Sequence, residues 1–346
     1  QEYTPMGIAE DTPMSRVVVT GAAGRLGGKT AAALKKLGKH VVGVDMIARP
    51  AHVSDDVVSE YIQCNLAEEG VAKKTLLTAM AGADAVVHLA AWPGPAKTGP
   101  PAVAKTGADK DAGAIIGLED ASPTRLLRDN IVMTAEVCDS AVEAGLSRVV
   151  FSSSAFAMGW SHASTGSQSW NPAYLPADED HAPMPTETYG LSKQLCEEIL
   201  RTAARTAKST SFVSLRFTNI VKTEMWGKLP WPAPTPAKSP PLVFWAYTHE
   251  DDVVDAHVQA VLRSSAAAPG EHEAYLIAAP DTRYKEPTLE LMSNVLGVKS
   301  MASPSTGGPL EGNASPLSCR KARLRLGFNP RSWQDNEGTV KRARLA

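Results

Sequence analysis

The sequence lacks a cluster of metal-binding residues, a long apolar run and a strong net charge. It has only four cysteines in 346 residues, and they form neither a CxxC pair nor a Cys/His cluster. This spacing indicates neither a zinc site nor a disulfide framework, and a reducing compartment is the simplest interpretation. The cysteines are Cys64, Cys138, Cys196 and Cys319.

No stretch approaches the ~18 consecutive apolar residues that cross a bilayer. Residues 1–13 are polar and acidic rather than a charged head followed by an apolar run. We therefore expect a cytoplasmic protein with no membrane partner. The 35 lysines and arginines nearly balance the 37 aspartates and glutamates, for a formal charge of −2. That balance argues against nucleic acid as the main partner.

Hydrophobic residues make up 43% of the chain, which predicts a packed globular core. The β-branched runs at Val17–Val19 and Val41–Val44 are typical of strands buried on both faces of a parallel sheet. Further strands are predicted at 84–91, 147–152 and 212–217, with helices at 129–144 and from about Thr188. This alternation predicts an α/β fold with a doubly wound parallel sheet.

At ~150 residues per domain, the length predicts about two structural units. We expect a dinucleotide-binding Rossmann domain over 14–216 and a smaller, mainly substrate-binding subdomain over 217–346, from which 242–262 return to the first. Residues 92–123 are rich in Gly, Pro, Ala and Lys and predict a mobile insertion or a lid. The remaining predictions are a proline-rich loop over a site at 230–241, helices near 251–263 and 287–296, and a solvated basic helix face at 320–325.

The first predicted strand is followed by a glycine-rich turn, TGAAGRLG at 20–27. Gly21, Gly24 and Gly27 allow a tight turn, a close approach of backbone to a pyrophosphate and close packing of the next helix. The free N–H groups at that helix start attract phosphate. The turn therefore predicts a dinucleotide site that includes Arg25 and Leu26, although a purely structural turn has the same composition.

Asp45 ends the second predicted strand about 20 residues after the glycines, where an acid binds the adenosine ribose hydroxyls and repels a 2′-phosphate. This position favours NAD over NADP. Arg25 and Arg49 are close enough in sequence to accept a 2′-phosphate instead, and an ordinary surface aspartate is the structural alternative.

Tyr189 and Lys193 stand at i and i+4 of a predicted helix, so their side chains lie on one face. A neighbouring ammonium is expected to lower the pKa of the phenol and to make it a usable general acid or base. Ser152, Ser153 and Ser154 follow a strand at the carboxyl edge of the sheet, where doubly wound folds bind ligands.

With these motifs the sequence resembles the extended short-chain dehydrogenases/reductases of the NAD-dependent epimerase/dehydratase type, a family that includes UDP-galactose 4-epimerase and uronate dehydrogenase. The resemblance covers nearly the whole chain in the family's order. It rests on TGAAGRLG at 20, Asp45, CNL at 64, HLAA at 88, Asn130, FSSSAFAMG at 151, YGLSK at 189, LRFTNI at 215, EDDVVDAH at 250 and KARLRLGFNP at 321.

The resemblance implies a role for each matching residue. Ser154 would hold the reacting oxygen, with Ser153 as its nearest rival, Tyr189 would transfer the proton, and Lys193 would bind the nicotinamide ribose. Cofactor positions are Gly21, Gly24, Gly27 and Asp45, with Asn65 and Leu66 beside the adenine and Ala90 under the cofactor. Asn130 would support a water or a backbone carbonyl in a proton relay, or be a plain residue at a helix start.

Nucleotide-sugar members of the family usually carry an arginine before the segment that here reads FWAYTHEDDV at 244–253, and this chain has none there. We therefore expect a small sugar, sugar acid or secondary alcohol as substrate. A nucleotide-sugar 4-epimerase with tightly bound NAD and a non-catalytic dinucleotide sensor remain alternatives. Arg283 and Lys222 are possible anion contacts, each expected to be an ordinary surface charge.

Two further expectations concern aromatic residues and assembly. Trp160, Trp226, Trp231 and Trp245 fall in loops near the predicted nicotinamide site and would either stack on a substrate or fill the core. The resemblance also implies a homodimer paired through helices 129–144 and 189–206. The acidic run 178–180 is interpreted as a solvated loop, and the histidines lack metal-ligand spacing.

Overall fold

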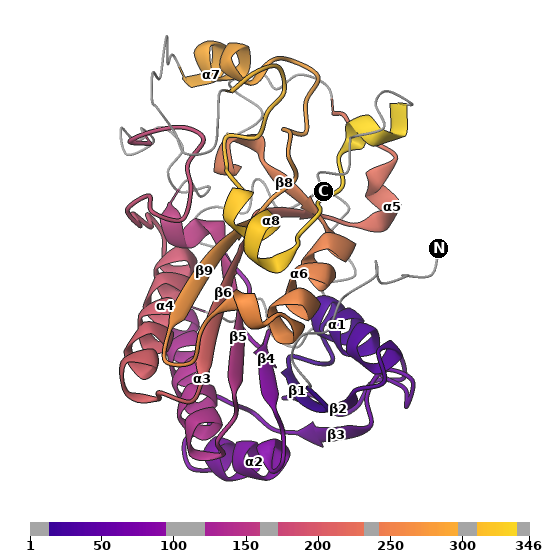
Figure 1. Ribbon diagram of the computed structural model, residues 1–346, viewed down its shortest axis with the longest axis vertical. Coiled ribbons are helices and arrows are strands. Elements are labelled where there is room, and N and C mark those ends of the chain that lie inside the picture. Colours follow the sequence, from indigo (N-terminus) through magenta and orange to yellow (C-terminus); the bar gives the residue numbers. More distant parts are fainter. Residues whose placement is uncertain (1–13, 95–121, 160–171, 232–241, 297–309, 338–346) are drawn as a thin grey trace.

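A computed structural model describes residues 14–94, 122–159, 172–231, 242–296 and 310–337. Its main feature is a seven-stranded, wholly parallel sheet with strand order β3-β2-β1-β4-β5-β6-β9 (Figure 1). The strands are β1 Arg16–Thr20, β2 His40–Asp45, β3 Glu60–Gln63, β4 Ala85–His88, β5 Arg148–Ser154, β6 Ser211–Phe217 and β9 His272–Ile277.

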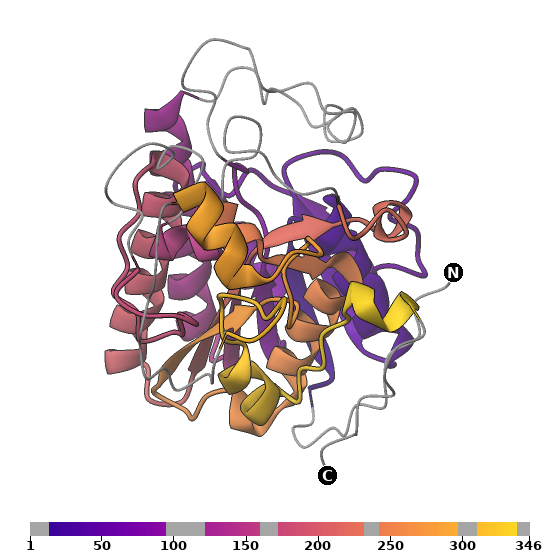
Figure 2. The same cartoon turned by 90° about the horizontal axis from the view of Figure 1, so that it is seen from above.

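Helices cover both faces of the sheet, as the doubly wound prediction requires. Figure 2 shows α1 and α6 on one side and α3 and α4 on the other, and the buried apolar side chains form a separate cluster on each side. The predicted α/β fold is confirmed. The helices are α1 Arg25–Lys36, α2 Val71–Met80, α3 Pro123–Glu143, α4 Thr188–Thr206 and α6 Glu250–Leu262.

The direction of strand order changes between β1 and β4, and such a switch point places a ligand crevice beyond the carboxyl ends of the strands. The sequence elements with chemical signatures lie at this edge. The glycine turn follows β1, Asp45 ends β2, Ser154 ends β5, and α4 begins one residue before Tyr189.

Above this edge lies a smaller lobe (Figure 1). It contains a second, two-stranded parallel sheet of β7 Asn219–Val221 and β8 Tyr247–His249, together with three short helices. The helices are α5 Thr223–Trp226, α7 Thr288–Leu296 and α8 Arg320–Leu326. Of the segment after residue 216, α6 and β9 pack within the main sheet domain, and the buried residues of α8 join the same apolar cluster.

Helix α3 begins earlier than the predicted helix at 129–144. The Ser122 hydroxyl accepts a hydrogen bond from Arg125 N at 3.2 Å, and Pro123 occupies the first turn, which together make a good helix start. The prediction missed this signal because it follows the Gly- and Pro-rich stretch. Residues 95–121 of that stretch, 232–241 of the proline-rich loop, and Trp160 lie outside the described residues.

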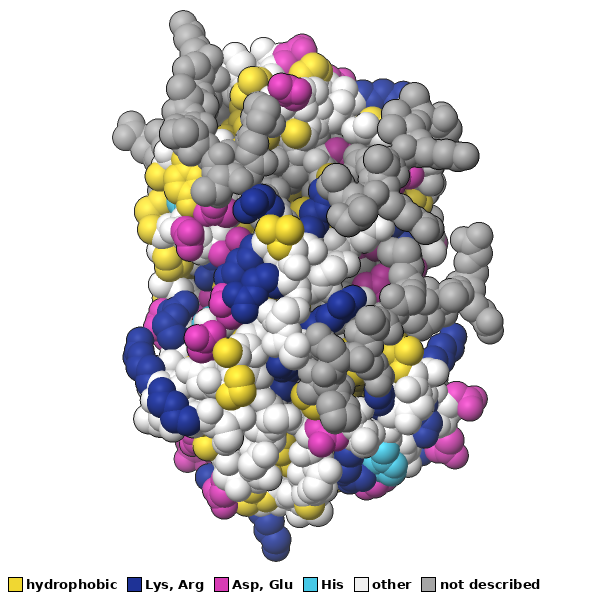
Figure 3. Space-filling view, viewed as in Figure 1, with side chains coloured by type: hydrophobic (Ala, Val, Ile, Leu, Met, Phe, Trp, Pro, Cys, Tyr) yellow, Lys and Arg dark blue, Asp and Glu magenta, His cyan; other side chains and the backbone are white. Residues whose placement is uncertain are grey.

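The basic run 320–325 forms α8 and is only partly the solvated face that was predicted. Figure 3 shows lysine and arginine side chains gathered over α8. Lys321 and Arg325, however, bind the carboxylate of Glu273 on β9 at 2.6 and 2.8 Å. Ala322 is buried beneath them, so α8 is also anchored to the edge strand of the sheet.

Candidate active site

The glycine turn packs too closely for side chains. A Cβ atom on Gly27 would lie 2.0 Å from Gly21 O, and Gly21 has a φ of +72° with its Cβ position 2.7 Å from Ala90 N. Helix α1 starts at Gly24 with no side-chain cap and no acid in its first turn. Its first N–H groups are therefore left for an external acceptor, which fits a phosphate group.

The other predicted cofactor residues surround this turn. Asp45 accepts hydrogen bonds from Ala23 N at 3.0 Å and Ile47 N at 3.3 Å. Both partners are backbone amides, so the carboxylate keeps acceptor sites for ribose hydroxyls. The Asp45 carbonyl accepts from Cys64 N at 2.7 Å, which brings the segment containing exposed Asn65 and buried Leu66 alongside.

Arginines near the turn have protein partners. The exposed Arg25 side chain lies 3.5 Å from the Glu250 carboxylate at the start of α6, and Leu26 beside it is half-buried. Arg49 donates to the Val53 carbonyl and to Asp55, both at 2.6 Å. Asp45, in contrast, is held by backbone amides, one of which is Ala23 N of the glycine turn.

Tyr189 is held at the start of α4 by Glu187. The Glu187 carboxylate accepts from Tyr189 N at 2.7 Å and from Gly190 N at 2.6 Å, and so caps the helix. The phenol hydrogen-bonds with Ser154 at the end of β5. The backbone at Gly94 lies directly on the tyrosine ring, because a Cβ there would be 2.1 Å from Tyr189 Cγ. The ring and its hydroxyl are fixed from three sides.

Lys193 lies one turn further along α4 and is buried. Its Nζ donates to the Ser152 carbonyl at 2.8 Å and stands 4.7 Å from the Phe151 ring centroid and 5.6 Å from that of Tyr189. Burial lowers the pKa of Lys193 to about 8. The structure therefore brings Ser154, Tyr189 and Lys193 together at one edge of the sheet.

The expected lowering of the Tyr189 pKa is wrong for this structure. Burial raises the pKa of the phenol, the Glu187 carboxylate raises it further, and the hydrogen bond with Ser154 lowers it only in part. The main physical reason is burial of the phenol, and the Lys193 ammonium donates its hydrogen bond to the Ser152 carbonyl. Tyr189 is therefore a neutral phenol, the form that can donate a proton.

A buried ion pair distinguishes the two candidate serines. The Ser153 hydroxyl donates to Glu197 Oε1 at 2.6 Å, and Glu197 in turn binds Arg216 of β6 at 2.7 Å. Burial alone would raise the pKa of Glu197, but the Arg216 guanidinium outweighs it and holds the pKa below its usual range. Ser153 is thus turned into the protein, and Ser154 faces Tyr189.

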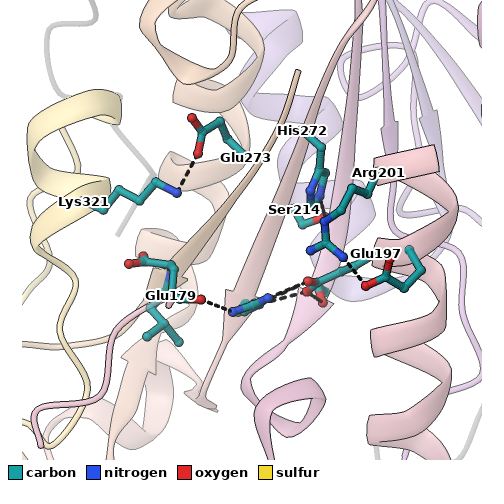
Figure 4. A network of polar contacts seen from close by, with 11 residues as sticks. Glu179, Glu197, Arg201, Ser214, His272, Glu273 and Lys321 are labelled. Carbon is teal, nitrogen blue, oxygen red and sulfur yellow. Dashed lines mark hydrogen bonds and ion pairs between the residues drawn. The ribbon is translucent and has the colours of Figure 1, made fainter. Parts of the chain in front are cut away.

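The same network reaches the loop before α4. Figure 4 shows Glu197 and Glu179 of this network. The Arg216 guanidinium, which is paired with Glu197, also donates to the Glu179 carbonyl at 3.3 Å. The Glu179 carboxylate accepts from Leu276 N of β9 at 2.7 Å. The acidic run 178–180 was interpreted as a solvated loop, and this is wrong for Glu179 because its carboxylate anchors a strand. Sequence reasoning missed Glu197, although its i+4 spacing from Lys193 places it on the same helix face.

Asn130 is not at a helix start, because α3 begins about two turns earlier. It is buried, accepts from Trp92 N at 2.7 Å, and donates to Trp92 O at 3.2 Å and to Ser192 at 3.0 Å. The Ser192 hydroxyl donates to the Tyr189 carbonyl at 2.7 Å. Asn130 therefore joins the segment leading to Gly94 to the first turn of α4. Its expected part in a proton relay stays a prediction.

The structure also describes three of the four candidate tryptophans and both possible anion contacts. Trp245 is fully buried, whereas Trp226 and Trp231 are partly buried. Arg283 was expected to be a surface charge, and this is wrong because the residue is only 8% exposed. Lys222 lies 3.8 Å from Glu224. Within the described ranges, no group of His, Cys, Asp and Glu could hold a metal ion, and no helix is both long and apolar enough to span a membrane.

Comparison with known proteins identifies related sequences over most of the chain. A family model described as the NAD dependent epimerase/dehydratase family matches residues 17–106 and 112–278. Among curated proteins, a UDP-glucose 4-epimerase of Corynebacterium glutamicum is 24% identical over 351 residues, covering 91% of this chain and 91% of the relative.

Solved structures with the same fold are numerous. A short-chain dehydrogenase/reductase superfamily protein from Agrobacterium tumefaciens with bound NAD superposes with a TM-score of 0.60 at 22% identity, covering 96% of this chain and 98% of the other. A mutated uronate dehydrogenase superposes with a TM-score of 0.54 at 18% identity, covering 95% and 87%. At these identities the structural similarity establishes the fold.

Proposed function

The chain belongs to the NAD-dependent epimerase/dehydratase family, and we propose that it is an oxidoreductase that moves a hydride between NAD and a hydroxyl or carbonyl carbon of a small sugar, sugar acid or secondary alcohol. The observation that supports this most is the arrangement of Ser154, Tyr189 and Lys193 at the carboxyl edge, with Ser154 in hydrogen-bond contact with the phenol. A protein that only binds the dinucleotide has no need of this arrangement.

The residues present fit NAD. The uncapped start of α1 and the side-chain-free packing of the glycine turn suit a pyrophosphate, which Gly21, Gly24, Arg25, Leu26 and Gly27 would hold. Asp45 would bind the adenosine ribose and Lys193 the nicotinamide ribose. Asn65 and Leu66 would lie beside the adenine, and Ala90 and Tyr189 beside the remainder of the cofactor. NAD bound there supplies the hydride acceptor or donor.

The protein's own contribution is to hold and move a proton. Tyr189 donates its hydroxyl proton to a substrate carbonyl oxygen, or accepts one from a substrate hydroxyl. Ser154 hydrogen-bonds the same oxygen and keeps it in line with the phenol. Because the pKa of Tyr189 is raised, loss of its proton needs a nearby positive charge, and Lys193, with a pKa of about 8, is still an ammonium at neutral pH.

A small substrate is favoured over a nucleotide sugar by the absence of an arginine from the segment 244–253. We assign cofactor binding to residues 14–216 and substrate binding mainly to 217–346. The likeness to UDP-glucose 4-epimerases supports a second candidate, a 4-epimerase that keeps NAD bound throughout its cycle.

The discriminating experiment is a screen for net NADH formation with D-glucuronate, D-galacturonate, the matching aldoses and simple secondary alcohols, run beside UDP-glucose and UDP-galactose. The proposal predicts stoichiometric NADH and oxidised product with at least one small substrate. Interconversion of the UDP-sugars without net NADH would assign the epimerase. Tight NAD binding without turnover of any compound would indicate a dinucleotide sensor.

We also propose that the protein pairs with a second copy through α3 and α4. A groove between these helices is lined by apolar side chains that include Ile131, Leu195 and Ile199. Val142 and Leu191 on the same helices are 37% and 36% exposed, which is high for residues of their size and character. Leu195→Glu should shift the protein from dimer to monomer in sedimentation, whereas an unchanged mass would contradict this pairing.

A further inference from the structure

Arg283 is a buried cation in the lobe above the sheet edge. The residue is 8% exposed, and its guanidinium lies 4.9 Å from the Trp231 ring centroid and 5.7 Å from that of Tyr284. Its backbone is fixed as well, since Arg283 N donates to Trp245 O at 3.3 Å and Arg283 O accepts from Trp231 N at 2.9 Å. Two aromatic rings therefore hold the guanidinium in place.

This guanidinium has no carboxylate partner among the residues that the structure describes. Its hydrogen-bond contact is with the side chain of Tyr284, a neutral group, and its Nε is buried with no hydrogen-bond partner. A buried charge without a counter-ion is unfavourable, and an arginine cannot escape by losing its proton. Protein groups within the described residues thus leave the charge of Arg283 unbalanced.

A second unpartnered donor belongs to Trp245, whose backbone carbonyl accepts from Arg283 N. Trp245 is fully buried, its ring centroid is 6.3 Å from that of Tyr284, and its Nε1 has no hydrogen-bond partner within the described residues. Both the indole N–H and the guanidinium Nε–H can only donate hydrogen bonds. Two such groups beside one tyrosine ring leave a local excess of donors, which an anionic oxygen would satisfy.

The backbone that carries Trp245 is strained. Val243, Phe244 and Trp245 have φ values of 45°, 50° and 61°, so three consecutive non-glycine residues are left-handed. Left-handed backbone is unfavourable for residues with a Cβ atom, and such strain persists where the surroundings enforce it, commonly at ligand sites. A strained segment that holds Trp245 against the same tyrosine ring as Arg283 is more than core filling requires.

The lobe that contains Arg283 packs against the catalytic edge. Arg283 follows β9, which pairs with β6, and β6 pairs with β5 up to Ser154. The segment after Ser154 shares one apolar cluster with Trp245 and Tyr284, in which Ala155 and Met158 are buried. The unbalanced cation therefore belongs to the same edge of the sheet as the proton-transfer residues.

We propose that Arg283, with Trp245 beside it, recognises an anionic oxygen group of the substrate, and that this group is the carboxylate of a sugar acid. A single carboxylate balances the single charge and accepts hydrogen bonds from planar guanidinium donors. This inference rests on the proposed function, and it narrows the substrates to acids. A phosphate oxygen of a nucleotide sugar has the same hydrogen-bonding chemistry, and the experiment separates the two sources.

The test compares Arg283→Met and Arg283→Lys with Arg323→Met, which removes an exposed arginine of α8. Steady-state kcat and KM are measured for D-glucuronate and D-galacturonate and for the neutral D-glucose and D-galactose, together with the Kd for NAD. Removing one partner of a buried charge pair should lower kcat/KM for the acids at least about 30-fold. The aldoses and NAD affinity should change less than about threefold, and Arg283→Lys should recover part of the loss. Arg323→Met should match the unmodified protein.

Each other outcome overturns a defined part of the proposal. Equal losses with acids and aldoses would show that Arg283 is only a packing residue. Oxidation of aldoses but not acids would refute the carboxylate while leaving the dehydrogenase intact. Loss of UDP-glucose conversion in Arg283→Met, with no activity on acids, would assign the anion to the diphosphate.

If no compound is turned over, the proposed function is rejected. A binding measurement then tests the anion site by itself. D-Glucuronate is then titrated calorimetrically into the NADH-loaded protein and into Arg283→Met. Binding that is lost in the variant supports the anion site without the reaction. Equal binding, or none to either protein, refutes it. Thermal unfolding of both variants confirms that they are folded.

Discussion

Two buried arginines in this molecule have opposite surroundings. Arg216, in the sheet, makes paired hydrogen bonds with Glu197, and the two side chains are 5% and 3% exposed. Arg283, in the lobe, faces two aromatic rings and has no acid among the described residues. A carboxylate of the protein balances the first charge, whereas the described residues supply none for the second. This difference separates a residue that holds the fold from one that recognises a ligand.

A third buried basic residue, His257, shows why the difference between the two arginines is informative. His257 of α6 is fully buried, its Nδ1 lies 2.8 Å from Val253 O, and its Nε2 has no hydrogen-bond partner within the described chain. Burial lowers the pKa of His257 to about 4, so the ring is neutral at physiological pH. Histidine can discard an unfavourable charge and arginine cannot, so of these two residues it is Arg283 that needs an external anion.

The largest expected effect comes from breaking the balanced pair. Arg216→Met leaves the Glu197 carboxylate buried without a counter-ion, and the free energy of unfolding should fall by about 3–5 kcal/mol. Chemical denaturation measures this directly. The double variant Arg216→Met/Glu197→Met removes both charges and should regain most of the loss. If the single variant were as stable as the unmodified protein, Arg216 would not be held by the pair.

The next effect concerns pH. Because the folded pKa of His257, about 4, is below its unfolded value near 6.5, the unfolded chain binds more protons between these pH values. Stability from this residue is therefore complete above pH 6.5 and lost as the pH falls toward 4, by up to about 3 kcal/mol. In His257→Asn the dependence of unfolding free energy on pH over this window should flatten. An unchanged slope would show that His257 is not buried as a neutral ring.

A smaller effect is expected at Asp45, at the end of β2, whose hydrogen-bond partners among the described residues are backbone amides. Asp45→Ala should reduce the preference for NAD over NADP by about tenfold, or roughly 1.4 kcal/mol, because the ribose contact and the repulsion of a 2′-phosphate are both lost. Kd values for NADH and NADPH measure it. Equal selectivity in variant and unmodified protein would remove Asp45 from the cofactor site.

The smallest effect on stability is expected at the unbalanced arginine. Arg283→Met replaces an uncompensated buried charge with an apolar side chain of similar length, so the free energy of unfolding should change by less than about 1 kcal/mol. The same substitution at Arg216 is the matched comparison. A loss at Arg283 as large as that at Arg216 would mean that both arginines hold the fold, and the contrast between them would disappear.

The sequence was most informative where local patterns set the structure. The glycine turn after a β-branched strand, the acid at the end of β2 and the Tyr189–Lys193 spacing each depend on a few neighbouring residues, and the structure places all of them at one edge. Short strand β3 was not predicted, because Glu60–Gln63 has no strong apolar alternation.

The remaining features depend on contacts between distant segments. The choice of Ser154 over Ser153 is made by Glu197 on α4, and the raised pKa of Tyr189 results from burial and the Glu187 cap. The burial of Arg283 depends on Trp231, more than fifty residues earlier. No local pattern in the sequence specifies these pairings. The sequence alone therefore predicted that Arg283 is a surface charge.

The central claim is that the Tyr189 hydroxyl moves the substrate proton, and one experiment tests it most directly. The rate of NADH formation is measured for the unmodified protein and Tyr189→Phe with the best small substrate, while NAD binding is titrated on the same samples. The account predicts a loss of turnover of about 10²–10⁴-fold with NAD affinity nearly unchanged. Turnover that survives the substitution, or falls only because NAD no longer binds, would contradict it.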